Sequence, residues 1–327
     1  MYLNTATFND FVTNADIKWT EGFKMIEPKA LNSGLFMIDP LRMGTGEDKE
    51  YSEIDSENFL QIGSEGSRNP ELLAQQGYNK RMVYYVRKGK VSITKEMRDE
   101  NKYKEVERKL LNLGKYVPQT RERDLTLRFT YANATSYTQD GKTIDVSAPD
   151  GLAMCYSAHT LRGTSTTYRN RLTGDPLLST GSLETAGRLQ NEEILNQFGQ
   201  KQVVMFNVLV TGMDRATCNT AAEILQSTAK ISAPNEGVKN VWQAEYRHVK
   251  LPYLDVSATG APDSTKRAYW FLGSTENEPF IYSPAIEADT KAWEDEDTRI
   301  WHYSVYSKYG ICGINPRGLI GSFPTSS

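Results

Sequence analysis

Residues 46–63, GEDKEYSEIDSENFLQIG, and residues 81–93, RMVYYVRKGKVSI, decide the fold of this chain. In the first run, charged side chains alternate with apolar ones, as in a strand with one exposed face. The second run is rich in β-branched and aromatic residues, which favour strands. A cluster of Gly, Ser, Asn and Pro at 63–70 lies between them. We therefore predict a long two-stranded hairpin across residues 46–94.

This hairpin is too long and too charged to stand alone. An isolated two-stranded hairpin is marginally stable in water and persists by packing on another surface. We take that surface to be a neighbouring copy of the chain. The hairpin side chains expected to contact the neighbour are Tyr51, Ile54, Phe59, Tyr84, Tyr85, Arg87 and Lys88.

A helical period replaces the strand pattern after Lys95. Apolar residues recur at spacings of three and four amid alternating charge, and this stripe resumes beyond Pro118. We predict one long helix over about 96–134, bent or briefly broken near 114–118, because Gly and Pro both disfavour helix there. Mixed charge of this kind is typical of ion pairs within and between subunits, and Arg98 and Arg108 are candidate contacts.

The rest of the chain predicts an arm and a mixed module. Residues 1–45 are only weakly periodic and predict an extended arm. The predicted α/β module consists, in order, of a helix at about 182–195, a buried strand at 203–210, a helix at 215–227 capped by Asp214, and strands near 242–251 and 268–272. Strand patterning returns at 300–306, 310–314 and 318–320, with a turn at 315–318.

Composition limits the classes of function. The net charge of −3 leaves no excess of positive charge to neutralise phosphates, so a dedicated DNA-binding protein is not expected. The longest apolar run, 203–210, is far shorter than the roughly 20 residues of a membrane span. The N-terminal region lacks a signal-peptide pattern, and we expect a protein made and used in cytoplasm.

Cysteine, histidine and carboxylate positions predict no metal, cofactor or catalytic site. The three cysteines form no CxxC pair, and the three histidines have neither HxH nor HxxxH spacing. The acidic run at 47–57 fails the spacing of a calcium loop. The run at 294–297 indicates an exposed turn and not the paired carboxylates of a glycosidase.

One histidine supports a competing interpretation of the chain as a hydrolase. His159 lies in the polar stretch SAHTLRGT, where Asp140, Asp145 or Asp150 would orient it as a general base. No GxSxG nucleophile elbow accompanies it. We favour an imidazole that is hydrogen-bonded inside a loop, and we expect replacement of His159 by Ala to leave assembly largely intact.

The order of these parts resembles the major capsid proteins of tailed phages with the HK97-like fold, especially the branch of Mu-like head subunits. The segments that carry the resemblance are the hairpin 46–94, TRERDLTLRFTYANA (120–134), DGK (140–142), YSAH (156–159), TYRNRLTG (167–174), SLETA (182–186) and YGICGINPRGLIGS (309–322). The chain departs from the family pattern twice. His159 is followed by Thr where relatives have Pro, and Pro118 falls within the presumed spine helix.

The resemblance implies an α+β chain with the HK97-like capsid fold. Its expected parts are an N-terminal arm (1–45), an extended E-loop (46–94), a P-domain (95–202) with its spine helix at about 96–134, an A-domain (203–290) and return strands of the P-domain (291–327). It also implies a structural protein, not an enzyme. Copies would self-assemble into hexamers and pentamers that form the icosahedral head shell around the phage genome.

The same resemblance sets the expected location and partners. The protein would be assembled in host cytoplasm and reside in the virion. Expected partners are further copies of the chain, a separate scaffolding protein, a portal and decoration proteins, with the packaged double-stranded DNA contacted non-specifically and no membrane or cofactor. No motif selects a lysine and a partner for the crosslink of some relatives, so none is predicted. The alternative within this fold is an encapsulin-like nanocompartment shell.

Overall fold

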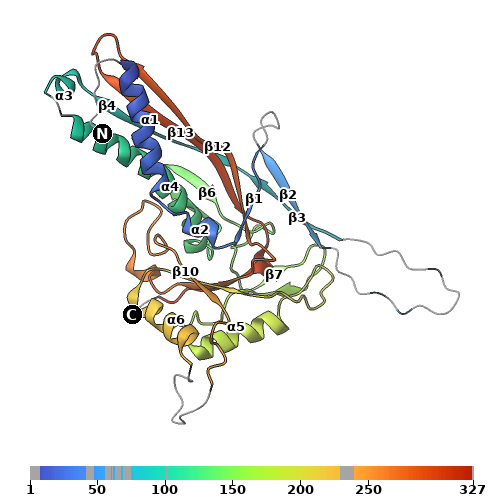
Figure 1. The fold of residues 1–327 in the computed structure, drawn as a ribbon. Coiled ribbons are helices and arrows are strands. Elements are labelled where there is room, and N and C mark those ends of the chain that lie inside the picture. Colours follow the sequence, from blue (N-terminus) through green and yellow to red (C-terminus); the bar gives the residue numbers. More distant parts are fainter. Residues whose placement is uncertain are drawn as a thin grey trace.

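The computed structural model describes residues 8–41, 48–55, 75–100, 102–228 and 239–325, together with Leu60, Ile62 and Arg68. The molecule has an elongated upper part, a wider lower part and a two-stranded ribbon that extends to one side (Figure 1). The upper part contains α1 (Phe8–Lys24), α3 (Lys95–Asp99), α4 (Tyr103–Thr130), β4 (Tyr84–Ile93), β12 (Phe280–Glu294) and β13 (Trp301–Gly313). The lower part contains α5 (Thr180–Glu192), α6 (Arg215–Gln226), β9 (Val208–Thr211), β10 (Arg247–Lys250), β11 (Trp270–Gly273) and β14 (Leu319–Ser322).

Short elements complete the described chain. The ribbon is formed by β2 (Lys49–Asp55) and β3 (Gln75–Met82). The others are α2 (Lys29–Asn32), β1 (Phe36–Ile38), β5 (Ser136–Gln139), β6 (Lys142–Asp145), β7 (His159–Thr160), β8 (Thr167–Tyr168) and the 3₁₀ turns η1 (Ser264–Lys266) and η2 (Pro316–Gly318).

The upper sheet has the strand order β1-β12-β13-β4. β13 pairs antiparallel with β4 from Trp301 opposite Ile93 to Gly310 opposite Tyr84. The run 81–93 is therefore not one hairpin strand, as the sequence suggested. It breaks at Val83, after which β4 leaves the ribbon and joins β13. The β-branched and aromatic residues that indicated a hairpin strand instead supply a strand that packs under α4.

The lower sheet has the strand order β10-β9-β11-β14; β9, β11 and β14 are buried, whereas the edge strand β10 is partly exposed. Along β9, Val208 and Val210 join the core beside α4, whereas Leu209 joins the core under α5 and α6. The predicted helix after Asp214 is confirmed, since the Asp214 carboxylate accepts from Thr217 N at 3.0 Å. The buried strand expected at 203–210 is shorter, because Val203 is exposed and pairing begins at Val208.

The strand expected at 318–320 does not return to the sheet of the long helix. It is β14, and it pairs antiparallel with β11, from Ser322 opposite Trp270 to Leu319 opposite Gly273. Leu319 and Ile320 contribute to opposite faces, one to each core. The segment thus completes the lower sheet, because an alternating pair of apolar side chains fits a sheet that is covered on both sides.

Residues 8–24 form a helix and not the expected extended arm. Phe11, Ala15 and Gly22 are the buried residues of α1, and small residues at two of these positions weaken the apolar period in the sequence. Gly22 and Gly114 mark the place where α1 crosses α4. A Cβ on Gly114 would collide with the carbonyl of Trp19. Gly114 therefore allows two helices to touch and does not break one.

The break in the long helix lies elsewhere than predicted. α3 ends at Asp99, α4 begins at Tyr103, and α4 then runs through Pro118 to Thr130. A proline in a helix costs about 3 kcal/mol. Burial of the stripe on both sides of it, at Leu113 and Leu125, offsets that cost.

The buried carboxylate of Asp124 joins α4 to two strands and a hairpin. It accepts hydrogen bonds from Arg87 Nε of β4 at 2.9 Å and from the Tyr309 hydroxyl of β13 at 2.7 Å. Gln139 Nε2 of β5 donates at 3.2 Å. Burial, with the nearby carboxylate, raises the pKa of Tyr309, so this hydroxyl keeps its proton and donates it. Asp124 thus fixes the helix against the upper sheet.

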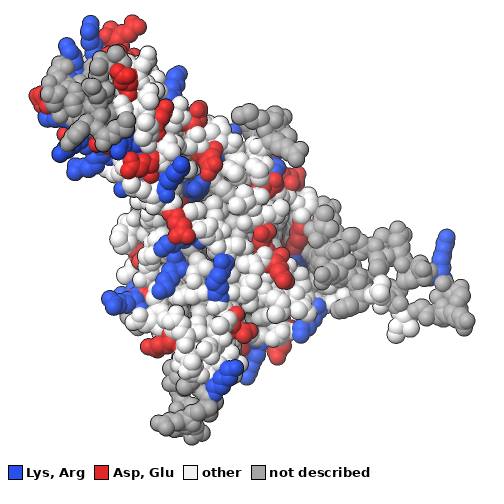
Figure 2. Space-filling model, in the orientation of Figure 1, with Lys and Arg blue, Asp and Glu red and all other residues white. Residues whose placement is uncertain are grey.

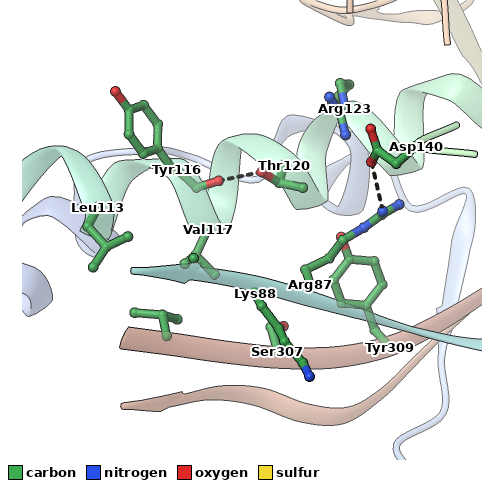
Figure 3. A pocket seen from close by; sticks show the side chains of 12 residues that line it. Arg87, Lys88, Leu113, Tyr116, Val117, Thr120, Arg123, Asp140, Ser307 and Tyr309 are labelled. Carbon is green, nitrogen blue, oxygen red and sulfur yellow. Dashed lines mark hydrogen bonds and ion pairs between the residues drawn. The ribbon is translucent and has the colours of Figure 1, made fainter. Parts of the chain in front are cut away.

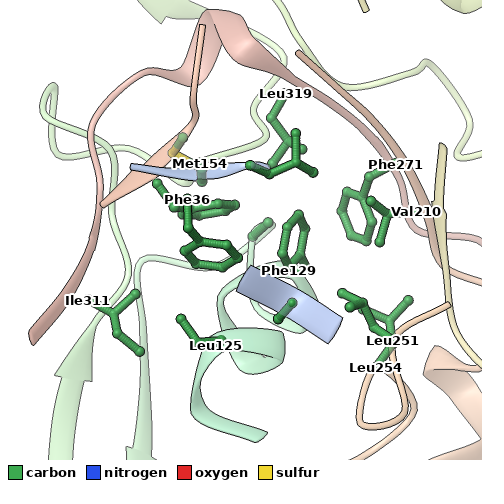
Figure 4. Packing of buried hydrophobic residues seen from close by; sticks show 14 of the residues in the cluster. Phe36, Leu125, Phe129, Met154, Val210, Leu251, Leu254, Phe271, Ile311 and Leu319 are labelled. Carbon is green, nitrogen blue, oxygen red and sulfur yellow. The ribbon is translucent and has the colours of Figure 1, made fainter. Parts of the chain in front are cut away.

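Aromatic rings join the end of α4 to both sheets (Figure 4). The Phe129 ring lies 4.9 Å from that of Phe280 in β12 and 5.5 Å from that of Phe271 in β11, both edge to face. Phe36 of β1 packs on the same ring at 5.8 Å. Such contacts add to the apolar burial, so one helix end supports the upper and lower parts together.

The crossing of α1 and α4 makes a first prediction. Gly114→Ala should destabilise the subunit by about 1 to 3 kcal/mol, because the added methyl group forces two backbones apart. Gly187→Ala in α5 is the matched control, since its Cβ would meet nothing within 4 Å. That change should stabilise by up to about 1 kcal/mol through helix propensity. Chemical denaturation of the unassembled subunits measures both, and equal effects would contradict the close crossing.

Glu122 predicts a dependence of stability on pH. Its Oε1 accepts from Ala30 N at 2.8 Å, Oε2 has no hydrogen-bond partner among the described residues, and burial raises its pKa to about 7. The folded chain therefore holds this proton more tightly than the unfolded chain. Stability is greatest below the ordinary pKa of Glu and falls as pH rises to about 7, by about 3 kcal/mol in all.

Glu122→Gln removes this titration while keeping the shape of the side chain. Unfolding should then differ less between pH 5 and pH 8 than in the native chain, and the variant should be the more stable of the two at pH 8. An unchanged difference between the two pH values would assign the effect to other groups.

Candidate assembly interface

The ribbon confirms part of the predicted hairpin. β2 and β3 pair antiparallel, from Lys49 opposite Met82 to Asp55 opposite Gln75. Along β3, Lys80 and Met82 are buried against the subunit and Asn79 and Arg81 are exposed, as expected for a strand with one buried and one solvent-facing side. In Figure 1 the ribbon leaves the body beside β1 and points away from α4, α5 and α6.

Polar contacts tie the base of the ribbon to its own subunit. The Glu53 carboxylate pairs with the Arg317 guanidinium, which is 3% exposed, and accepts from Gln197 Nε2 at 2.9 Å. Lys80 Nζ lies 2.6 Å from Asp145 Oδ2. Because one partner of each ion pair is deeply buried, the base has a defined direction. A neighbouring copy would therefore contact a ribbon whose direction is fixed by its own subunit.

The tyrosines that were predicted to contact a neighbouring copy make contacts within their own subunit. The Tyr51 hydroxyl donates to Asp39 Oδ2 at 2.8 Å, and burial, followed by this carboxylate, raises the Tyr51 pKa. Tyr84 shares a hydrogen bond of 2.8 Å with Ser283. Tyr85 is half-buried against an apolar cluster of α4 and the β5–β6 hairpin. Their part in contacts with a neighbour stays a prediction.

The remaining predicted contacts differ in their exposure. Arg87 is held by Asp124, whereas Lys88 is exposed, with its Nζ 5.5 Å from the centre of the Tyr306 ring. Arg108 is exposed on α4. Phe59 and the side chains of Ile54 and Arg98 lie outside the described residues. Among the predicted residues, Lys88 and Arg108 are the described ones that present a charge to solvent.

A groove that the sequence did not indicate lies between α4 and the upper sheet. Its volume is about 310 Å³. Leu113 and Val117 point from α4 toward β4 and β13 (Figure 3). Gly89 of β4 lies opposite Leu113 and, having no side chain, leaves the space open. The only signal in the sequence is this glycine in a strand, which often marks a close approach or a gap.

Charge on the surface is mixed. Lys and Arg lie among Asp and Glu over the face in Figure 2, with no continuous basic area on it. This agrees with the net charge of −3. Within the described residues there is no group of side chains that fits a metal ion, and no helix there is long and apolar enough to cross a membrane.

His159 is enclosed and does not face a cleft. The ring is fully buried and stacks on Tyr168, with centroids 5.1 Å apart. Nδ1 lies 2.6 Å from Asp150 Oδ2, and Nε2 lies 3.2 Å from Asn170 Oδ1. Of the three aspartates that were predicted to orient His159, Asp150 is therefore the one that contacts its ring. Asn170 Nδ2 also donates to three backbone carbonyls, so this cluster joins loops of the lower part.

This burial changes the expectation for His159→Ala. The substitution removes the hydrogen-bond partner of the buried Asp150 carboxylate, which should cost about 1 to 3 kcal/mol. The double variant His159→Gln with Asp150→Asn keeps neutral hydrogen-bonding groups and should lose less. Thermal unfolding of both variants distinguishes them. If His159→Ala unfolds like the native chain, the ring does not support these loops.

Comparison by sequence finds no match for this chain, whereas comparison by structure does. No family model and no curated protein matches this chain. The capsid of Ralstonia phage GP4 matches its structure with a TM-score of 0.53 at 13% identity, over 89% of this chain and 88% of that one. The capsid structure of cyanophage P-SCSP1u matches with 0.54 at 11% identity, over 90% and 87%.

A structure of Gordonia phage Cozz matches with a TM-score of 0.54 at 10% identity, over 91% of this chain and 87% of that one. At such identities the match concerns the fold, and neither the Mu-like branch nor the boundaries of the expected domains are tested by it. The chain has the fold of phage capsid proteins, which confirms the predicted α+β, HK97-like fold class.

Proposed function

We propose that this chain is a structural major capsid protein. Copies of it assemble into hexamers and pentamers, and these form the icosahedral head shell that encloses a phage genome. The protein acts through contacts between its surfaces and performs no chemical reaction. It resides in the virion after assembly in host cytoplasm.

The observation that supports this proposal is a capsid fold with a ribbon whose base is anchored on its own subunit. The fold matches phage capsid proteins over about nine tenths of the chain. The ribbon is anchored by the Glu53–Arg317 pair, yet Leu60 and Ile62 beyond it are 83% and 103% exposed. These two side chains bury little surface on their own subunit. It gains stability when another copy covers it, which is what a shell provides.

The expected domains and partners belong to the same proposal. The upper part, with α4 and the upper sheet, would serve as the P-domain, and the lower part, with α5 and α6, as the A-domain around the capsomer axis. This proposal moves α5, which lies within the range 95–202 expected for the P-domain, into the A-domain. A separate scaffolding protein, a portal and decoration proteins would join the shell. The mixed charge of the surface suits a wall that confines double-stranded DNA by non-specific contact.

Electron microscopy of the purified full chain tests the proposal. Closed shells or ring-shaped capsomers are expected. Replacing residues 56–74 by a short turn, or by a Gly/Ser linker of the same length, should leave a folded subunit that forms no shells, because the ordered base at β2 and β3 remains. Circular dichroism checks the fold of both variants. A native chain that stays a dispersed monomer at high concentration, with or without a scaffold, would overturn the proposal.

A further inference from the structure

The short helix α2 links α1 to β1 and is held in place from α4 (Figure 1). It is four residues long, and Pro28, which precedes it, provides no side-chain cap. Its first turn is instead capped from another element, because Glu122 Oε1 accepts from Ala30 N at 2.8 Å. Ala30 itself is fully buried in the core beside α4. One carboxyl group of α4 thus takes the place of an N-cap residue.

The other end of α2 is held by a group whose charge does not change. The Arg247 guanidinium of β10 donates to the Asn32 carbonyl at 3.2 Å and to the Ser33 carbonyl. An Arg guanidinium stays protonated throughout the pH range in which proteins fold. Gly34, at a φ of +74°, then turns the chain toward β1. Of these two contacts, the one at Glu122 is therefore the one that pH can change.

The site of Glu122 is unfavourable for a negative charge. The residue is 2% exposed, and its Oε2 has no hydrogen-bond partner among the described residues. The charged side chains that influence it most are Arg121, Lys29 and Glu27. Arg121 pairs with the Glu287 carboxylate at 3.0 Å, and Lys29 is exposed, so neither neutralises Glu122 at close range. Burial therefore outweighs the single donor and favours the neutral acid.

We propose that α2 is a latch, which protonation of Glu122 closes on α4 and ionisation of Glu122 opens. While the carboxyl group is neutral, residues 27–31 stay docked through Ala30. Once it loses its proton, the buried charge is stabilised by reaching water, and the first turn of α2 leaves α4 while Arg247 retains the other end. Burial raises the pKa of Glu122 to about 7, so the latch opens as pH rises through neutrality. It acts within one subunit and does not depend on the proposed shell.

Hydrogen exchange of the unassembled full chain, followed by mass spectrometry, tests the latch. Protection of a peptide that covers α2 is compared with that of a peptide from α5 at pH 6 and at pH 8. Each value is taken relative to the unfolded chain at the same pH, which removes the chemical effect of pH on exchange. With a pKa of about 7 in the closed latch and the ordinary pKa of Glu in the open one, α2 should lose about tenfold in protection between pH 6 and pH 8. The peptide from α5 should not share this loss.

Glu122→Gln keeps the acceptor for Ala30 N but cannot ionise, so its α2 should be equally protected at both pH values. Glu184→Gln, a change at an exposed position of α5, is the matched control and should keep the tenfold loss in α2. An equal loss in α2 and α5 of the native chain would show that pH acts on the whole fold and would overturn the latch. A loss that persists in Glu122→Gln overturns it as well. If that variant does not fold, the comparison of α2 with α5 in the native chain still decides.

Discussion

A carboxylate that cannot reach water holds the upper part of the molecule together. Asp124 lies inside the long helix α4, where an unpaired charge would cost several kcal/mol, so every neighbour must supply a donor to it. Arg87, Tyr309 and Gln139 do so from three different elements. The spacing of helix and sheet is set by these hydrogen bonds at one point. Further along the helix, beside Val117, the groove lies between helix and sheet.

Periodicity in the sequence predicted the long helix, α6 and the existence of the ribbon, because each buries one regular face. It did not predict α1. Ala15 and Gly22 count as weakly apolar in a pattern, yet their small size is what lets α1 approach α4. Gly114 was taken as a breaker for the same reason. A glycine in a helix costs stability only when nothing uses the space it leaves, and a sequence does not show which helix will come to use it.

The candidate contacts were harder to predict than the fold. An alternating strand with tyrosines and charges indicates a surface, but it does not say whether a hydroxyl meets solvent or a nearby carboxylate. Tyr51 and Tyr84 find partners within the chain, on residues that are distant in sequence. Lys88 is exposed, and its contact with a neighbour stays a prediction. The groove escaped prediction because it is formed by a helix and two strands whose positions depend on Asp124.

The pairing of β4 with β13 also governs how the chain is made. Ile93 can pair with Trp301 only after Trp301 has been synthesised, so about 200 further residues leave the ribosome before β4 pairs with β13. At ordinary rates of synthesis this is a delay of about 10 to 40 s. During that time β4 is an unpaired strand edge, the kind of segment that aggregates. Three of its ten residues are Arg87, Lys88 and Lys90, with Gly89 among them. Charges and a glycine in the unpaired strand oppose premature pairing between nascent chains. Arg87, Lys88 and Gly89, which line the groove in the folded chain, thus also protect the chain before it folds.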